Sequence, residues 1–489
     1  MTSGRRLIIA FASLGFLAVG ALAAWHFSSV GLTLSHYDAR GHLTVARRVT
    51  DSLTPGWRQF GALWLPLPHL LNLIPARSLW NYHTGFSAVV INIVAMAFGL
   101  GALARLIARR TGSATAAVAA TVVVLANPAV LYLQSTPMTE PLLFALCWLA
   151  LDALDRTLDV PEAAAVRPAA GLWLALAVLT RYEAWPVAAA LVTLAALART
   201  GADRRRIFLR LAVWPVTAAA TFLLLGRWAL GSWFADAGFF TADNPAAHQP
   251  TVAIAQIVHG FVDLAGWPVV LLAGAGVVLS VIAARQRRST RPLLPLALVA
   301  SAALPLIAFL DGHPFRIRYL VPLIAASGAF IGTAIAAAPK RWRPGAAAFA
   351  IVLSVWVRPS LSPAAPMTRE AQRERPAQLD RAPVTAALAA IDDGLPILAS
   401  MAGLGHYMQE TTRPGLTLRS YITEGNGDLW SAAIAAPRHH AGWLLIEEAA
   451  EGGDQLATLS RQNVHFLDGF TRVAEGGGAV LYRNNSLIH

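Results

Sequence analysis

Residues 81–110 read NYHTGFSAVVINIVAMAFGLGALARLIARR, an apolar run followed by three arginines. The run over 81–104 exceeds the length of about 20 mostly apolar residues that a membrane-spanning helix needs. Loops on the cytoplasmic side of a membrane carry an excess of Lys and Arg. Arg105, Arg109 and Arg110 therefore place the end of this helix in the cytoplasm, so one stretch predicts both a span and its direction.

The composition of the whole chain agrees with a membrane protein. Its 489 residues are 56% hydrophobic and 13% charged, whereas soluble globular proteins carry about 25% charged and about 45–50% apolar residues. This excludes a water-soluble multidomain enzyme and an intrinsically disordered chain. Cys147 is the only cysteine, which excludes a disulfide scaffold. We attribute the net charge of +12 to basic residues that mark the cytoplasmic side of the membrane, and we expect no nucleic-acid partner.

Similar apolar runs recur over the first 357 residues and predict a polytopic α-helical membrane protein. Two shorter runs, 169–180 and 186–198, are too short for an untilted span and are predicted to be half-helices. Such a break is tolerated where it is buried in protein or lines a cavity. With these two, we expect about eleven transmembrane segments, some of them half-length. The longer runs lie at 7–27, 81–104, 113–133, 139–155, 207–227, 264–284, 292–310, 319–338 and 344–357.

Basic residues alternate between the loops in a way that predicts the topology. With the N-terminus inside, the inner loops hold most of them and the outer loops after the first hold few. We predict a multi-pass protein of the cell membrane with a cytoplasmic N-terminus and an extracytoplasmic C-terminal domain. A cleavable signal peptide is the alternative for the first run, but the run is long for one. The inner-loop residues are Arg5, Arg6, Arg105, Arg109, Arg110, Arg156, Arg167, Arg199, Arg204, Arg205, Arg206, Arg285, Arg287, Arg288, Arg291, Lys340, Arg341 and Arg343.

Changes in composition predict three parts. Residues 1–357 form the expected transmembrane module, whose first outer loop, 31–80, carries helices on the membrane surface. Residues 358–377 are rich in Pro and Arg and are predicted to be a linker. Residues 378–489 alternate strand and helix patterns, which indicates a small soluble α/β domain on the outer side. Its expected elements are a helix at 378–392, strands at 396–400, 416–421, 443–447 and 479–483, and helices at 427–436 and 453–461.

Ionisable residues near a membrane are costly and often functional, and here they gather at the outer ends of the spans. The first outer loop holds Asp38, Arg40, His42, Arg47 and His69. Asp38 is a candidate base, although an Asp in the first turn can also simply cap its helix.

Two more groups lie at the starts and breaks of helices. Glu140 opens a predicted span, and Arg181, Tyr182 and Glu183 occupy the break between the half-helices. Glu140 is a second candidate carboxylate, but an acidic residue is also ordinary chemistry for a helix start. Arg181 and Glu183 either line a cavity or pair with each other as a structural device.

The fourth group is His313, Arg316, Arg318 and Tyr319, between the runs 292–310 and 319–338. Arginines on the outer side depart from the charge pattern and need a local reason. A phosphate is one, because a guanidinium matches its geometry in a fork. Snorkelling of long side chains to the membrane interface is the alternative.

Together these groups suit a transfer reaction on a phosphate-activated substrate. One carboxylate can accept a proton from an attacking hydroxyl, and cations can stabilise the charge that grows on a phosphate leaving group. The sequence has no phosphate-binding glycine loop before a Lys, no His-Glu-x-x-His and no nucleophile elbow. An ATP-driven machine and a zinc protease are therefore not expected.

The same residues resemble a known family. Asp38 with Ala46-Arg47, the Pro-rich stretch 64–69, Glu140-Pro141 and the stretch 318–322 are similar to motifs of the GT-C superfamily of membrane glycosyltransferases. The likeness is to protein O-mannosyltransferases and lipid A aminoarabinose transferases (glycosyltransferase family 39), and it covers residues 1–340. Two departures are that Ala39 follows Asp38 where many members have Glu, and that the lysine of the family's Lys-Pro-Pro-Leu stretch is absent.

The resemblance implies a GT-C-like fold and an inverting glycosyltransferase. The donor would be a sugar on polyprenyl phosphate, and the acceptor a hydroxyl of a lipid, glycan or protein at the outer face of the membrane. Asp38 would be the base, with Glu140 as the family's second acidic site, and the two could share a divalent cation. A transporter or lipid flippase and a non-catalytic GT-C-like binding protein remain alternatives. The expected substrate-binding residues are Arg40, His42, Arg47, His69, Arg181, Tyr182, Glu183, His313, Arg316, Arg318 and Tyr319.

Overall fold

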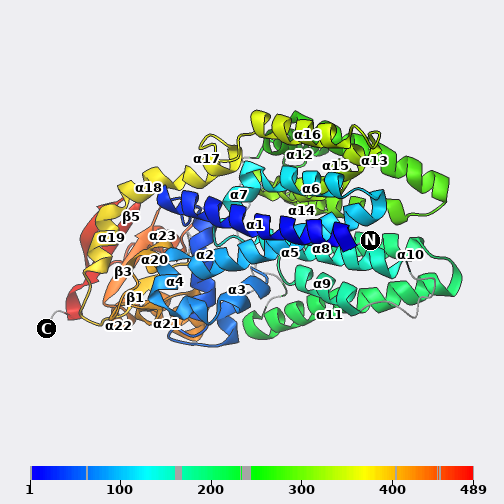
Figure 1. The fold of residues 1–489 in the computed structure, drawn as a ribbon. Coiled ribbons are helices and arrows are strands. Elements are labelled where there is room, and N and C mark those ends of the chain that lie inside the picture. The colour runs from blue at the N-terminus through cyan, green and yellow to red at the C-terminus, as the bar shows by residue number, and fades with distance from the viewer. Residues whose placement is uncertain are drawn as a thin grey trace. The chain divides into compact units, whose positions relative to one another are not determined.

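The computed structural model describes residues 3–61, 64–159, 168–231, 233, 244–401, 405–448, 450 and 453–487 (Figure 1). Its contacts divide the chain into two compact units. Unit 1 comprises Met1–Val30, Val89–Phe222 and Ala242–Glu370. Unit 2 comprises Gly31–Ala88, Leu223–Thr241 and Ala371–His489. The predicted inner-loop residue Arg167 and residues 232 and 234–243 of the predicted outer loop 229–262 lie outside the described residues.

The regular secondary structure in the described part of unit 1 is entirely helical. Six helical segments are long and apolar enough to cross a membrane: Ile8–Ser29, Phe86–Thr111, Gly201–Ala229, Trp267–Arg287, Arg291–Leu310 and Ile317–Ala337. Shorter apolar helices accompany them, so the prediction of a polytopic α-helical membrane protein is confirmed. The elements are α1 (Ser3–Ser29), α5 (Phe86–Thr111), α6 (Ala114–Leu125), α7 (Pro128–Gln134), α8 (Glu140–Thr157), α9 (Pro168–Val178), α10 (Ala184–Leu197), α11 (Gly201–Leu230), α12 (Pro250–Ala265), α13 (Trp267–Arg287), η4 (Arg291–Ala302), α14 (Ala303–Leu310), η5 (Ile317–Leu320), α15 (Pro322–Ala337), α16 (Arg343–Val357) and α17 (Pro366–Gln372).

The predicted half-helices are present as α9 and α10, with a break between Val178 and Ala184. The run 113–133, in contrast, was predicted as one span and is two helices, α6 and α7, bent by 72°. Asn127 accounts for the break, because its Oδ1 accepts the backbone N–H of Ala129 at 2.9 Å and so caps a new helix. Pro128 follows at a position that suits a first helical turn.

The stretch 229–262, between the predicted spans 207–227 and 264–284, was expected to be an outer loop, and its second half is mostly helical. Helix α12 occupies Pro250–Ala265. Gln256, His259 and Asp263 interrupt its apolar residues, so no long apolar run reveals it. The predicted span 292–310 is helical, but its first part, η4, has 3₁₀ geometry, and Pro295 inside it lacks the N–H that an α-helix would use.

Small residues allow the helices of unit 1 to approach closely. A Cβ on Gly276 of α13 would lie 2.0 Å from the backbone oxygen of Phe330 on α15. On Gly99 of α5 it would lie 2.5 Å from the Cα of Ala145 on α8. Small residues at helix contacts are typical of membrane proteins, where van der Waals packing drives association.

Unit 2 combines short helices with one five-stranded sheet. The strand order is β2-β1-β3-β5-β4; β1 is parallel to β2 and β3, and β5 is antiparallel to β3 and β4. The strands are β1 (Ile397–Ala399), β2 (Tyr421–Ile422), β3 (Trp443–Glu447), β4 (Phe470–Gly476) and β5 (Ala479–Asn484). The helices are α2 (Tyr37–Arg48), η1 (Trp57–Phe60), α3 (Leu67–Asn72), η2 (Pro75–Arg77), α4 (Leu79–Thr84), α18 (Glu374–Asp380), α19 (Ala382–Ala389), α20 (His406–Thr411), η7 (Leu418–Ser420), η8 (Glu424–Asn426), α21 (Asp428–Ala435), α22 (Pro437–His440), α23 (Gln455–Gln462) and η9 (Asn485–Leu487).

The small C-terminal sheet was predicted in outline and differs in two strands. Strand β4 was missed, since residues 470–476 are mostly exposed and polar and form an edge. The strand expected at 416–421 is only the two-residue β2, because Thr417 caps the short turn η7 just before it. The predicted helix 378–392 is divided between α18 and α19. Pro383 lies in the first turn of α19.

Unit 2 joins the first loop to the C-terminal residues. Gln59 Nε2 donates to the carbonyl oxygen of Gly425 at 2.7 Å, and Gln409 Nε2 donates to that of Tyr82 at 3.0 Å. The His83 ring bonds the carbonyl oxygen of Thr412 at 2.7 Å. The contacts thus group the loop with residues after 370, whereas the predicted boundaries place it with the spans. Helices α17 and α18 occupy much of the predicted linker 358–377.

Candidate active site

Glu140 is the first residue of α8 and is fully buried. Asn92 of α5 holds the turn before it, because its amide donates to the carbonyl oxygens of Thr136 at 2.8 Å and Met138 at 2.7 Å. Glu140 Oε2 accepts the backbone N–H of Thr139 at 3.1 Å. The expected place of Glu140 in the first turn of a helix is therefore confirmed.

Arg181 lies in the break between α9 and α10 and bridges two carboxylates. Its Nη1 is 3.1 Å from Glu140 Oε1, and its Nη2 is 2.8 Å from Glu183 Oε1. Nη1 also donates to Thr139 Oγ1 at 2.9 Å. The interpretation of Arg181 and Glu183 as an ion pair is confirmed, and Glu140 is an additional partner from another helix.

Arg318 approaches the same carboxylate from η5. Its Nε is 3.8 Å from Glu140 Oε1, and its guanidinium lies over the ring of Tyr319, 5.3 Å from the centroid. Arg318 is only 5% exposed, so snorkelling to an interface does not describe it. Glu370 supports this turn, since its Oε2 accepts the backbone N–H of Ile317 at 2.9 Å.

His313, Arg316 and Tyr182 are close in sequence to members of this cluster. His313 Nε2 is 3.4 Å from the hydroxyl of Tyr319. Burial lowers the pKa of His313, and the charges of Arg316 and Arg318 lower it further. The Tyr182 ring packs against Trp185, with 5.6 Å between centroids. Both His313 and Arg316 are half-buried.

The cluster of Glu140, Arg181, Glu183 and Arg318 is a buried network whose formal charges cancel. Burial of an unpaired ion costs several kcal/mol. The guanidiniums offset this cost for the carboxylates, and the carboxylates hold the guanidiniums in position. A carboxylate that two guanidiniums engage is better suited to hold them in place than to take up a proton. Chemically, the arrangement presents oriented guanidinium groups beside a helix break.

Asp38 belongs to unit 2, where it is the second residue of α2 and 4% exposed. The cap of this helix is His36, whose Nδ1 accepts the backbone N–H of Asp38 at 3.2 Å. The capping role that an Asp often plays is therefore taken by another residue. The start of the helix does not explain why a carboxylate is buried at this position.

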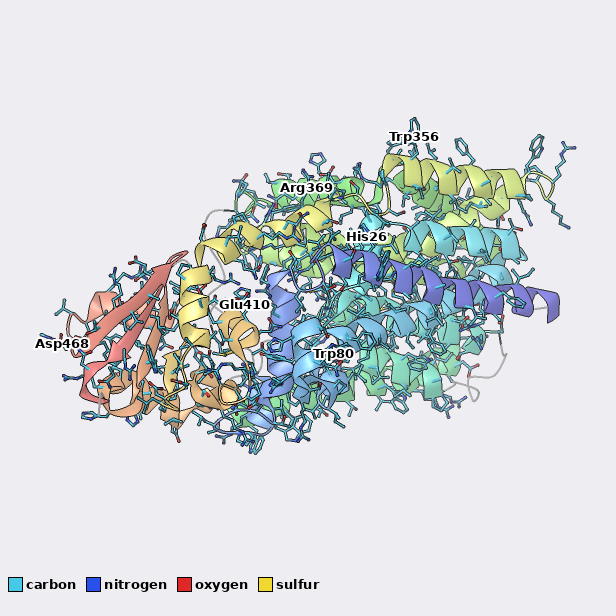
Figure 2. The ribbon with its side chains drawn as sticks, turned by 60° about the vertical axis from the view of Figure 1, so that its left-hand side comes forward. His26, Trp80, Trp356, Arg369, Glu410 and Asp468 are labelled. Carbon is cyan, nitrogen blue, oxygen red and sulfur yellow. The ribbon has the colours of Figure 1, made fainter. Side chains whose placement is uncertain are left out.

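Arg40, two residues on, is held by the C-terminal part of unit 2. It forms an ion pair with Glu410 of α20, which Figure 2 shows beside α2. Arg381 Nη2 reaches the same carboxylate at 2.7 Å, and Arg40 Nε donates to the carbonyl oxygen of Leu34 at 3.0 Å. These contacts give Arg40 a structural role in fixing the start of α2.

His42 and His69 lie together under an indole ring. His42 Nδ1 is 3.0 Å from His69 Nε2, and the Trp64 ring lies 4.2 Å from that of His42 and 5.9 Å from that of His69. Burial and the charge of Arg48 lower the pKa of His69 to about 3. His69 is therefore neutral at ordinary pH.

Arg47 closes the first loop on itself. Its Nε donates to Asp51 Oδ2 at 2.7 Å, and its Nη1 donates to the carbonyl oxygen of Ala76 at 3.1 Å. Its guanidinium also lies over the ring of Tyr82, 4.8 Å from the centroid. The structure thus gives this predicted substrate-binding residue several partners within the loop.

Sequence reasoning missed several residues that shape these clusters. Glu370, Asn92 and the hydroxyl of Thr139 act through contacts between segments distant in sequence, and no local pattern marks them. The contact of Trp64 with the two histidines was also not foreseen. Within the part of the chain that the structure describes, no group of three His, Cys, Asp or Glu side chains is placed to hold a metal ion.

Comparison with solved structures assigns the fold. No known protein family matches the sequence, and no curated protein sequence matches it. ArnT from Cupriavidus metallidurans, bound to undecaprenyl phosphate, matches with a TM-score of 0.61 and 14% identity over 96% of this chain and 97% of that chain. Its apo structure matches with a TM-score of 0.59 and 14% identity over 97% and 98% of the two chains.

A third match is the oligosaccharyltransferase of Archaeoglobus fulgidus, in complex with zinc and sulfate. Its TM-score is 0.52 at 14% identity, and the match covers 98% of this chain and 73% of that chain. Both proteins are members of the GT-C superfamily. The expected GT-C-like fold is therefore confirmed, with spans and C-terminal sheet included in the matched length.

Proposed function

We propose that this chain is an inverting glycosyltransferase that moves a sugar from a polyprenyl-phosphate donor to a hydroxyl of a lipid, glycan or protein at the outer face of the membrane. The observation that carries the proposal is the buried cluster in which Arg181 and Arg318 share Glu140. Such a cluster presents two oriented guanidinium groups, which can donate hydrogen bonds to a phosphate. A GT-C fold matched to ArnT with undecaprenyl phosphate bound supports a lipid phosphate as the group recognised.

Asp38 is the proposed general base. It would accept the proton of the acceptor hydroxyl as the hydroxyl oxygen attacks the anomeric carbon and the bond from that carbon to the phosphate oxygen breaks. A single direct displacement inverts the anomeric centre, and one base is enough to accept the proton of the attacking hydroxyl. The burial of Asp38 and the presence of a different helix cap support this assignment.

Arg181 and Arg318 are proposed to offset the negative charge that develops on the departing polyprenyl phosphate. Glu140 and Glu183 would act as positioning residues that hold the guanidiniums. His313, Arg316, Tyr182 and Tyr319 are proposed to contribute to donor binding around this cluster, and His42 and His69 to substrate binding in the first loop. Arg40 and Arg47 would support the loop that carries Asp38. These steps use protein side chains only.

The proposal is tested by the variant Asp38→Asn, which keeps the shape of the side chain and removes the base. The purified full chain in nanodiscs is incubated with undecaprenyl phosphate bearing aminoarabinose, mannose or glucose, with membrane lipid as acceptor. Release of undecaprenyl phosphate is measured by mass spectrometry. We expect the rate to fall by about 10²-fold or more, the scale of general-base catalysis.

The matched control is Asp392→Asn, an exposed carboxylate of unit 2, which should keep wild-type activity. Full activity of Asp38→Asn would remove Asp38 as the base. A wild-type protein that exchanges lipid-linked sugar across proteoliposomes but transfers none would contradict the proposal and favour the transporter alternative.

A further inference from the structure

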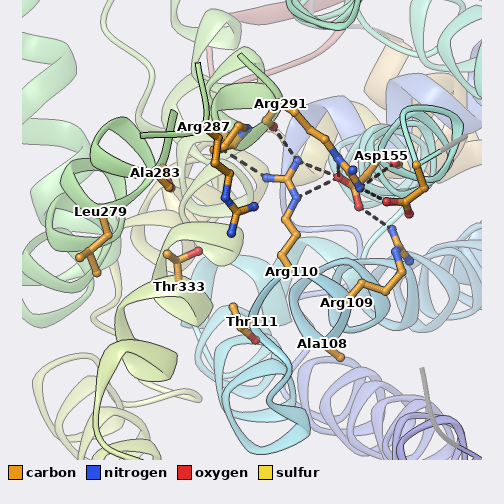
Figure 3. A pocket seen from close by; sticks show the side chains of 13 residues that line it. Ala108, Arg109, Arg110, Thr111, Asp155, Leu279, Ala283, Arg287, Arg291 and Thr333 are labelled. Atoms are coloured by element: carbon orange, nitrogen blue, oxygen red, sulfur yellow. Dashed lines mark hydrogen bonds and ion pairs between the residues drawn. The ribbon is translucent and has the colours of Figure 1, made fainter. Parts of the chain in front are cut away.

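A basic cavity of about 650 Å³ lies within unit 1, away from the cluster of Glu140. Figure 3 shows its lining, which comes from the end of α5, the end of α8, the last turns of α13, the start of η4 and one residue of α15. Glu140 and Asp155 are 15 positions apart on α8, so the two sites are about 22 Å apart along that helix. The cavity is thus separate from the proposed transfer site.

The carboxylate of Asp155, near the end of α8, accepts hydrogen bonds from three arginines. Asp155 is fully buried and accepts from Arg109 at 3.0 Å, from Arg110 at 3.0 Å and 3.1 Å, and from Arg291 at 3.0 Å. Asp159 pairs with Arg291 at 2.5 Å. Four arginines against two aspartates leave the lining with an excess of positive charge.

Arg287 supplies a guanidinium that this network does not use. It lines the cavity, and it has no ion pair or hydrogen bond with any residue that the structure describes. In Figure 3 its side chain reaches into the space between Thr333 and Arg110, apart from the ion pairs around Asp155. An unpaired guanidinium directed into a basic cavity is a ready donor for an anion.

The hydroxyls of the lining already donate within their own helices. Thr111 donates to the carbonyl oxygen of Ile107 at 2.7 Å, Thr333 to that of Ala329 at 2.9 Å, and Ser280 to that of Gly276 at 2.8 Å. The groups that remain to bind a ligand are therefore the guanidiniums, and the ligand they fit is an anion rather than a neutral polar molecule. Leu279, Ala283 and Ala108 add an apolar wall.

We infer that this cavity binds the phosphate of an anionic membrane phospholipid, with Arg287 as its principal contact. A guanidinium binds phosphate through two parallel N–H···O bonds, and basic pockets between membrane helices take anionic headgroups. The apolar wall favours a phosphate that carries acyl chains over a free phosphate ion. By the predicted topology the lipid belongs to the cytoplasmic leaflet. The inference does not depend on the proposed function, because it concerns binding alone.

The test uses the purified full chain and native mass spectrometry. Dioleoyl phosphatidylglycerol is titrated against the wild type, Arg287→Gln and the control Arg285→Gln, which removes an exposed arginine of the same helix that does not line the cavity. We expect Arg287→Gln to retain the lipid about tenfold more weakly than the wild type, because one charge-assisted contact is lost. Arg285→Gln should retain it as well as the wild type does. Arg287→Glu should lose at least as much.

Two further titrations distinguish the source of the phosphate. Dioleoyl phosphatidylcholine should be retained less well than phosphatidylglycerol, and millimolar inorganic phosphate should not displace the bound lipid. Equal retention of phosphatidylglycerol by Arg287→Gln and Arg285→Gln overturns the inference. Displacement by inorganic phosphate alone overturns the lipid as the ligand and assigns the cavity to the free ion.

Discussion

At the scale of single residues, several of the buried charges that the structure describes lie in groups. Glu140 is shared by two arginines, and Asp155 by three. The sequence could predict the pair of Arg181 and Glu183 because they are two positions apart. It could not predict that Glu140 completes the pair, because that contact depends on how α8 packs beside the break. Asp38 was found by its place after the first span, and its role stays a prediction.

His69 makes stability depend on pH in a direction that can be worked out. Its pKa in the folded chain is about 3, whereas an unfolded histidine has a pKa near 6.5. Below about pH 6.5 the unfolded chain binds a proton that the folded chain does not, so this residue lowers stability as the pH falls toward 3, by up to about 1.4 kcal/mol per pH unit.

We expect His69→Gln to flatten the loss of thermal stability between pH 6.5 and 4.5. Melting temperatures of the purified protein across this range provide the measurement. The exposed His439, changed to Gln, is the control and should leave the pH profile unchanged. A His69→Gln profile as steep as that of the wild type would show that another group dominates.

At the scale of elements, apolar runs predicted most helices, and local chemistry decided where they break. Asn127 and Pro128 end one helix and begin another within a continuous apolar stretch, so hydropathy alone could not reveal the bend. Helix α12 and strand β4 were missed because neither has a continuous apolar run. Polar residues interrupt the apolar residues of α12, and β4 is an exposed edge strand. The close helix contacts depend on single glycines. No sequence pattern shows which residue of another helix lies against each glycine.

The contact of α13 with α15 predicts contrasting effects of two glycine substitutions. Gly276→Ala would place a methyl group 2.0 Å from a backbone oxygen of Phe330, which forces the helices apart and should cost about 1–3 kcal/mol. Gly274→Ala on the same helix meets nothing within 4 Å and should be neutral or stabilise by up to about 1 kcal/mol through helix propensity.

The measurement is the fraction of monodisperse protein that survives heating in detergent. Gly276→Ala should lose this fraction at a lower temperature than the wild type, and Gly274→Ala should not. Equal survival of the two variants would mean that α13 and α15 are not packed this closely.

At the scale of the whole molecule, the sequence predicted a GT-C-like membrane protein with a C-terminal sheet but not the grouping of its parts. Residues 31–88 and 371–489 belong to one compact unit. This grouping rests on contacts such as Gln59 with Gly425, which join segments that have no recognisable complementarity in sequence. The orientation in the membrane rests on the distribution of arginines and stays a prediction.

That orientation can be tested with introduced cysteines. In a Cys147→Ala background, Gln286→Cys and Asp311→Cys each place one thiol at an exposed position, at the end of α13 and after α14. The predicted topology puts residue 311 outside and residue 286 inside. We expect a membrane-impermeant maleimide to label Asp311→Cys in intact cells and Gln286→Cys only after permeabilisation. The reverse pattern would invert the topology.

The ion pair between Arg40 and Glu410 also has a consequence for the order of events during synthesis. The two residues are 370 positions apart in the chain, and ribosomes add about 5–20 residues per second. The first loop is therefore made about 20–70 s before its partner exists. During that interval Arg40 and its neighbours lack the contacts that bury them in the finished protein, so a newly made chain offers chaperones and proteases this loop until its last quarter has been translated.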